Sequence, residues 1–114
     1  MKPTRYFSKK QESGVAKRLG GRTVANSGAT LFSAGDVKIN RQFLLECKTS
    51  TTPKQSFSIK KEWLEKLNRE RFNMGQQHCA LVFNFGPNQQ NYYVIDEDLF
   101  KLLLEEENDE TDIG

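Results

Sequence analysis

The sequence predicts a single α/β domain in which helices flank a mixed β-sheet. Its 114 residues are enough for one hydrophobic core, and 36% of them are hydrophobic. Apolar residues recur at helical spacing in some segments and at strand spacing in others. The resulting order is helix, two strands and a third strand or loop, helix, two strands, helix, which is typical of a sheet covered by helices.

Three segments have the pattern of helices. Ser8 and Gln11 have the spacing of a capping box, and the pair Gly20-Gly21 is a typical C-terminal stop. A second helix has Ile59, Trp63, Leu67 and Phe72 on one face and ends at Gly75. Asp96 is the expected N-cap of the third helix. The helices are therefore expected at residues 8–19, 58–73 and 96–107, with an acidic, frayed tail at 108–114.

Four segments have the full pattern of strands, and a fifth has it only at its start. Residues 23–35 are expected to begin as a strand and continue as a loop rich in Ser, Gly, Ala and Thr. The tight connection at 40–42 predicts that the strands before and after it form a hairpin. The apolar run HCALVFNF is too unbroken to be exposed on both faces. Strands are expected at 36–40, 43–49, 78–85 and 91–95.

Charge is distributed unevenly along the chain. Residues 1–61 contain 13 Lys and Arg but three acids, Glu12, Asp36 and Glu46, whereas residues 62–114 contain four Lys and Arg and 12 acids. A basic half suggests a polyanionic partner, because Lys and Arg release counterions when they neutralise phosphates. A basic surface kept for solubility is the alternative. A phosphate-binding surface should exclude carboxylates, because they repel phosphate, unless they have a function there.

Two of these acids have the spacing of a metal site. Glu46 and Lys48 are two residues apart in a strand, so their side chains share a face. The hairpin would bring Asp36 beside them. Hard cations such as Mg²⁺ take carboxylate oxygens and share phosphate oxygens with a substrate. A solvated strand face with a cross-strand salt bridge is the alternative, because the spacing alone is common.

The motifs resemble those of the PD-(D/E)XK nuclease superfamily, and within it the Holliday junction resolvases of archaea, bacteria and phages. The shared pattern is a helix glutamate (Glu12), Ser27-Gly28, Gly35-Asp36 and Glu46-Cys47-Lys48-Thr49. The resemblance covers roughly residues 8–85. It departs at Gly35, where the superfamily often has proline. It implies a restriction-endonuclease-like fold, with residues 1–107 forming the nuclease domain.

The resemblance also implies a role for each motif residue. Asp36, Glu46 and the backbone carbonyl of Cys47 would hold Mg²⁺, for which Mn²⁺ can substitute, and Glu12 would hold a metal-bound water or a second ion. Lys48 would orient and stabilise the attacking water. A surface glutamate paired with a lysine is the alternative for Glu12. Candidate DNA contacts, each with a solvated side chain as its alternative, are Ser27, Arg5, Lys9, Lys10, Lys17, Arg18, Arg22, Lys38, Thr49, Lys54, Lys60 and Lys61.

The function expected from this resemblance is cleavage of four-way DNA junctions by a homodimer. A repair or restriction-type nuclease of the same fold, and a non-catalytic DNA-binding protein, are the alternatives. Apolar residues on the Trp63 helix or the strand at 78–85 are candidates for the subunit contact. Cys47 and Cys79 have no disulfide or zinc spacing, and neither a signal peptide nor a membrane-spanning run is recognised. We therefore expect a cytoplasmic protein of a prokaryotic or phage-infected cell, with no membrane partner.

Overall fold

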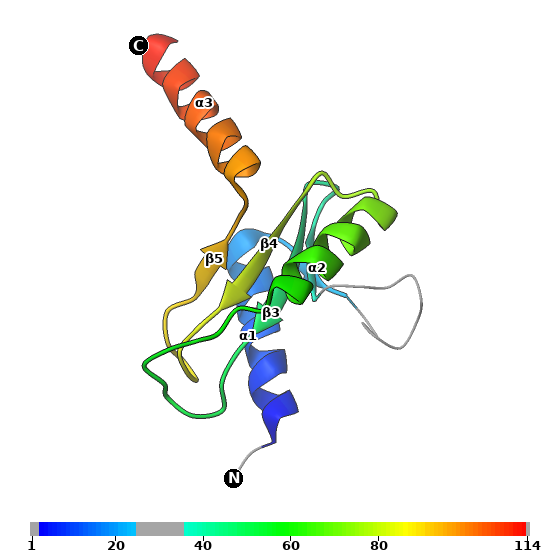
Figure 1. The fold of residues 1–114 in the computed structure, drawn as a ribbon, viewed down its shortest axis with the longest axis vertical. Coiled ribbons are helices and arrows are strands. Elements are labelled where there is room, and N and C mark those ends of the chain that lie inside the picture. Colours follow the sequence, from blue (N-terminus) through cyan, green and yellow to red (C-terminus); the bar gives the residue numbers. More distant parts are fainter. Residues whose placement is uncertain (1–2, 25–35, 114) are drawn as a thin grey trace.

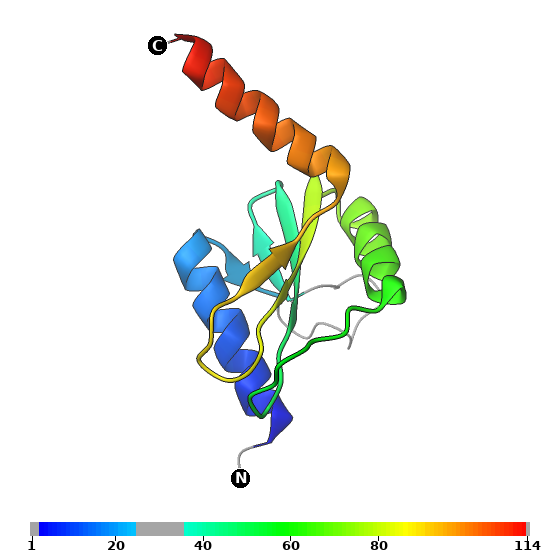
Figure 2. The same ribbon diagram turned by 60° about the vertical axis from the view of Figure 1, so that its left-hand side comes forward.

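A computed structural model describes residues 3–24 and 36–113, and the side chains of this part as far as residue 108 (Figure 1). Within it, five strands form one mixed sheet in the order β1-β2-β3-β4-β5. Helix α1 covers one face of the sheet and helix α2 the other, while helix α3 projects away from the sheet (Figure 2). The predicted single α/β domain with a mixed, helix-flanked sheet is confirmed at this level.

Helix α1 spans Thr4–Leu19 and begins four residues earlier than the capping-box pattern predicted. Its N-cap is Pro3, which lacks an N–H group and has the extended backbone of a residue before a helix. The capping box at Ser8 is therefore wrong, and Gln11 instead contacts the sheet. The predicted stop is confirmed, because Gly20 has φ of 71° and donates its N–H to the Ala16 carbonyl.

The predicted hairpin is confirmed as an antiparallel pair. Strand β2 spans Val37–Ile39 and strand β3 spans Phe43–Lys48, with Val37 opposite Leu45. The short strand β1, Arg22–Thr23, extends the sheet beyond β2, in agreement with the strand start expected near Thr23. The rest of the loop expected up to Gly35, including Ser27, lies outside the described residues.

Helix α2 connects β3 to β4, and these two strands are parallel. It spans Lys61–Asn73, three residues shorter at its start than predicted, and β4 spans His78–Phe83. A parallel pair needs such a crossover, because the chain must return to the end of the sheet where the first strand began, and a tight turn cannot do this. Strand β5, Tyr92–Val94, then pairs antiparallel with β4 and forms the sheet edge. Strand β4 is internal in the sheet and is covered on both faces, which explains its unbroken apolar sequence.

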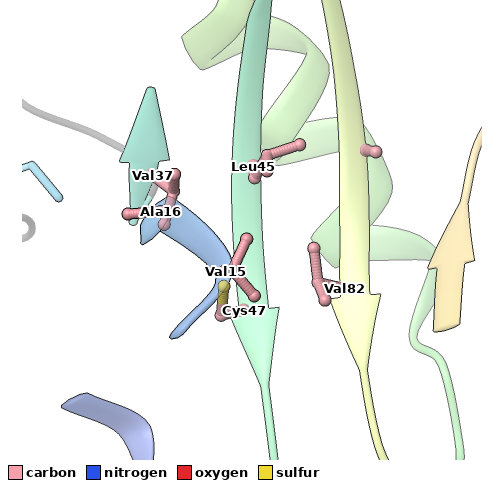
Figure 3. Close-up of a cluster of buried hydrophobic side chains, with 7 residues drawn as sticks. Val15, Ala16, Val37, Leu45, Cys47 and Val82 are labelled. Carbon is pink, nitrogen blue, oxygen red and sulfur yellow. The ribbon is translucent and has the colours of Figure 1, made fainter. Parts of the chain in front are cut away.

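Two hydrophobic clusters lie on opposite faces of the sheet. On one face, Val15 and Ala16 of α1 pack against Val37, Leu45, Cys47, Ala80 and Val82 (Figure 3). On the other face, Leu67 of α2 packs against Leu44 and Leu81, with Trp63 and Leu64 beside them. The alternation of side chains along β3 separates these clusters, so Leu45 and Cys47 face α1, whereas Leu44 faces α2.

Helix α3 spans Glu97–Ile113 and extends past residue 107, where the last helix was expected to end. The predicted cap is confirmed, because Asp96 Oδ1 accepts the Leu99 N–H at 2.9 Å. Leu99 is buried, but Phe100, Leu103 and Leu104 remain exposed. The predicted apolar face of α2 is confirmed at Trp63 and Leu67 but is wrong at its two ends, because Ile59 precedes the helix and Phe72 is 74% exposed.

Within residues 3–24 and 36–113, no helix is both long enough and apolar enough to cross a membrane.

Candidate active site

Asp36 is fixed against strand β3 by two hydrogen bonds. Its backbone N–H donates to the Leu45 carbonyl at 2.8 Å, and its Oδ2 accepts the Cys47 N–H at 2.7 Å. The carboxylate thus accepts a backbone N–H of β3 just before the start of β2. Since Val37 is opposite Leu45, the same register brings Asp36 next to Glu46. The predicted proximity of these two carboxylates is confirmed.

Glu46 and Lys48 project from β3 toward α2. Lys48 Nζ lies 3.8 Å from Glu46 Oε1, and 4.4 Å from the ring centroid of Trp63. The aromatic face attracts the ammonium group, and the lysine stem is held against the ring. Trp63, which was expected to be a core or subunit residue, therefore also positions Lys48. No pattern in the sequence connects a helix tryptophan with a lysine fifteen residues earlier.

Glu12 approaches Asp36 from the other side of the sheet. It precedes Val15 and Ala16 by about one turn, so it lies on the flank of α1 that packs against the sheet. Its pKa is raised to about 7, first by partial burial and then by the charge of Asp36, against the lowering effect of Lys9. The alternative of a simple surface pair with lysine is therefore incomplete, because Asp36 also affects this carboxylate.

The pKa of Glu46 is raised in the same way as that of Glu12. Partial burial and Asp36 raise the Glu46 pKa to about 7, while Lys48 opposes the rise. Asp36 therefore lies between two carboxyl groups and disfavours the ionised form of each. A divalent cation would reverse this effect by replacing repulsion with attraction.

The donor set fits a hard cation that retains water. Among the described residues, no group of three His, Cys, Asp or Glu side chains is placed to hold a metal ion. Asp36 and Glu46 provide two carboxylates, and the Cys47 carbonyl follows directly on the same strand. Mg²⁺ is commonly held by one or two carboxylates, with waters and substrate phosphates completing its shell. These residues suit Mg²⁺ better than zinc, which takes nitrogen and sulfur ligands in closed structural sites.

The Cys47 side chain has a structural role, unlike its carbonyl. It is buried in the cluster with Val15 and Leu45, and burial together with the nearby carboxylates raises the pKa of its thiol well above the ordinary range. A protonated thiol is a poor nucleophile and a poor metal ligand. Cys47 and Cys79 are both free thiols, as the sequence predicted.

These raised pKa values predict that the metal-free protein loses stability as pH rises from about 5 to 8. Between the ordinary value of 4.5 and about 7, the folded chain binds more protons at Glu46 than the unfolded chain does. The Glu46→Gln variant removes this penalty, so at pH 8 in EDTA it should be more stable than the unmodified protein by about 2 kcal/mol. Urea unfolding at pH 5.5 and pH 8 measures the difference. Glu65→Gln, at an exposed position on α2, is the control; equal gains in both variants would contradict the prediction.

The candidate DNA contacts differ in exposure, and Ser27 lies outside the described residues. Most are exposed on α1 and on the loop before α2, whereas Lys38 and Thr49 are half-buried. Thr49 is engaged within the protein, because its hydroxyl donates to Asn84 Oδ1 at 2.7 Å. Lys60 Nζ also lies over the Trp63 ring, 5.7 Å from the ring centroid. Contact of any of these residues with DNA stays a prediction.

No pattern in the sequence predicted a buried amide network beside β3. Gln11 Nε2 donates to the Lys48 carbonyl at 2.8 Å and lies 3.4 Å from Asn91 Oδ1. Asn84 Nδ2 donates to the same Asn91 oxygen at 3.1 Å. The available signal was Asn84 itself, a polar residue that ends an apolar strand and is 4% exposed. This network links α1, β3 and the β4–β5 connection at the C-terminal ends of the two parallel strands.

In comparisons with known proteins, no family model, curated protein or solved structure matches this chain.

Proposed function

We propose that this protein is a Mg²⁺-dependent DNA endonuclease with a restriction-endonuclease-like fold. The observation that carries the proposal is the placement of Asp36 beside Glu46 and Lys48. The Cys47 N–H holds the Asp36 carboxylate, and Lys48 lies 3.8 Å from Glu46 and against Trp63. A surface that only needed solubility would separate Asp36 from Glu46, because Asp36 raises the pKa of the Glu46 carboxyl.

Each residue has a defined task in phosphodiester hydrolysis. Asp36, Glu46 and the Cys47 carbonyl would hold Mg²⁺, which supplies charge stabilisation and a water of lowered pKa. Lys48 orients the attacking water and stabilises the negative charge that develops on the phosphate. Glu12 accepts a hydrogen bond from a water near Asp36. The water oxygen bonds to phosphorus and gives up a proton to solvent, the bond between phosphorus and the leaving oxygen breaks, and the leaving oxygen takes up a proton from solvent.

The proposed DNA surface consists of the exposed cations of α1 and the loop before α2. Binding through this surface should weaken steeply with salt. If about six phosphates are neutralised, log affinity should fall against log salt with a slope near −5, about two orders of magnitude between 0.1 and 0.3 M. Fluorescence anisotropy of a labelled duplex in EDTA measures the slope. A slope shallower than about −2 would show that the basic half is not the DNA surface.

The proposed substrate is the four-way junction and the proposed assembly is a homodimer. A junction has two-fold symmetry, and resolving it requires two symmetric cuts, whereas one chain has one Asp36–Glu46–Lys48 site. A two-fold dimer is the most common small assembly. The strand at 78–85 is unsuitable as the contact, because β4 is an internal strand of the sheet and is covered on both faces. Helix α3 offers Phe100, Leu103 and Leu104 instead, all exposed.

One cleavage assay tests the proposal. A four-way junction labelled on each strand in turn is compared with a matching duplex, with and without Mg²⁺ or Mn²⁺. Symmetric nicks in the junction alone would support the resolvase. Equal cutting of duplex would favour a repair or restriction-type nuclease, and binding without cutting would favour the non-catalytic DNA-binding protein.

A further inference from the structure

A cavity of about 770 Å³ lies between α1 and the connection from β4 to β5. It is at the end of the sheet where β3 and β4 both finish, the end at which α/β folds commonly bind ligands. Its size is in the range of small-molecule sites. The Gln11 hydrogen bond to the Lys48 carbonyl joins its wall to the strand of the candidate active site.

The charged residues of the cavity wall are all cations. Lys10 and Arg18 line it from α1, and within residues 3–24 and 36–113 no Asp or Glu lines it. Glu12 is next to Gln11 in the sequence but is not part of this wall. Two cations without a compensating carboxylate favour an anionic ligand group, and a phosphate suits the planar guanidinium of Arg18.

The remaining wall combines amides with aromatic rings. Gln11, Gln89, Gln90 and Asn91 contribute amide groups, each of which can both donate and accept hydrogen bonds. Gln11 is 7% exposed, and its Oε1 has no hydrogen-bond partner among the described residues. That enclosed oxygen would gain a donor from a ligand after a small rotation of the amide. Orphaned buried acceptors are uncommon because they cost free energy.

Aromatic rings line the same cavity. Phe7 and Tyr93 contribute them, and Tyr93 is 42% exposed. Nucleobases outside a duplex are recognised by stacking on aromatic rings and by hydrogen bonds to their edges. An acidic peptide would satisfy the cations but would leave the rings and the amide row without a matching partner.

We propose that this cavity binds a single unpaired nucleotide, with its base against Tyr93 and the amides and its phosphate at Arg18 and Lys10. That the nucleotide belongs to DNA rests on the proposed function. A nuclease that holds an unpaired nucleotide beside its active site would select branched or distorted DNA. The nucleotide chemistry itself could also come from a free mononucleotide, so the test includes both sources.

The test measures binding of the full chain without metal. The probes are a duplex with a fluorescent purine analogue in a single-base bulge, the same duplex with the analogue paired, and the analogue's monophosphate. Emission of this analogue falls when it stacks on a ring. We expect a decrease with the bulged duplex and none with the paired duplex. A decrease with the monophosphate of comparable affinity would assign the cavity to free nucleotides.

The variants are matched in position and exposure. Tyr93→Leu should abolish the emission decrease and lower affinity for the bulged duplex at least fivefold, in line with stacking on one base. Tyr92→Leu, whose position is next along β5 and also exposed, should change neither. Arg18→Gln should weaken binding of the bulged duplex and of the monophosphate, whereas Arg69→Gln on α2 should have less than a twofold effect.

Equal behaviour of Tyr93→Leu and Tyr92→Leu would overturn the cavity assignment, even if the protein cuts DNA with Mg²⁺. Conversely, failure to cut any DNA would overturn the proposed function but leave the monophosphate result to decide the cavity. Binding of an acidic peptide that is lost in Arg18→Gln, without any response to the nucleotide probes, would identify a peptide site and refute the proposal.

Discussion

Replacing Glu46 with Gln, or Asp36 with Asn, should lower Mg²⁺-dependent cleavage by about a thousandfold or more, because a transition-state interaction of about 4 kcal/mol is lost. Each change keeps the shape of the side chain but removes a negatively charged metal ligand. DNA affinity in EDTA should stay the same or increase, because the missing charge no longer repels phosphate. Single-turnover cleavage of a labelled junction and anisotropy on the same DNA provide the two measurements.

The other site residues should show graded effects. Lys48→Ala should also lose most activity but retain metal affinity better than the carboxylate variants, because the ammonium group repels the cation. Glu12→Gln should lose less, since its proposed contact is through water. Glu65→Gln is the control on exposed α2. Near-normal cleavage by either Glu46→Gln or Asp36→Asn would show that the metal site is wrongly assigned.

The double variant Phe100→Glu with Leu103→Glu should abolish the proposed dimer. Both side chains are exposed on the same flank of α3, and the helix projects from the sheet (Figure 1). Their burial against a second copy would stabilise the dimer by about 1.5–3 kcal/mol per side chain. We therefore expect the dimer dissociation constant to rise about a thousandfold or more, which light scattering at micromolar concentration would detect as a monomer.

The same variant should separate assembly from chemistry. Its fold should be intact by circular dichroism, because neither residue belongs to the buried clusters. It should still nick DNA but no longer make paired cuts in a junction. Ile59→Glu, at an exposed position before α2, is the control. An unchanged mass for the double variant, or a monomeric unmodified protein, would contradict α3 as the subunit contact.

Local patterns were sufficient for most of the architecture. The alternation over 36–40, the strand at 43–49 and the tight connection between them predicted the β2–β3 hairpin. Gly20 and Gly75 ended helices as expected, with φ of 71° and 70°. Helix starts were less predictable, because neither N-cap residue, Pro3 in α1 or Lys60 in α2, makes a side-chain capping hydrogen bond.

The sequence by itself determined that Asp36, Glu46 and Lys48 meet, because strand periodicity and a tight turn leave little freedom in a hairpin. Tertiary structure alone decided what surrounds them. Trp63 reaches Lys48 only because the α2 crossover packs on that face of the sheet, and Gln11 reaches the Lys48 carbonyl only because α1 packs on the other. Such contacts depend on the packing of elements distant in the chain, whose relative placement no local periodicity encodes.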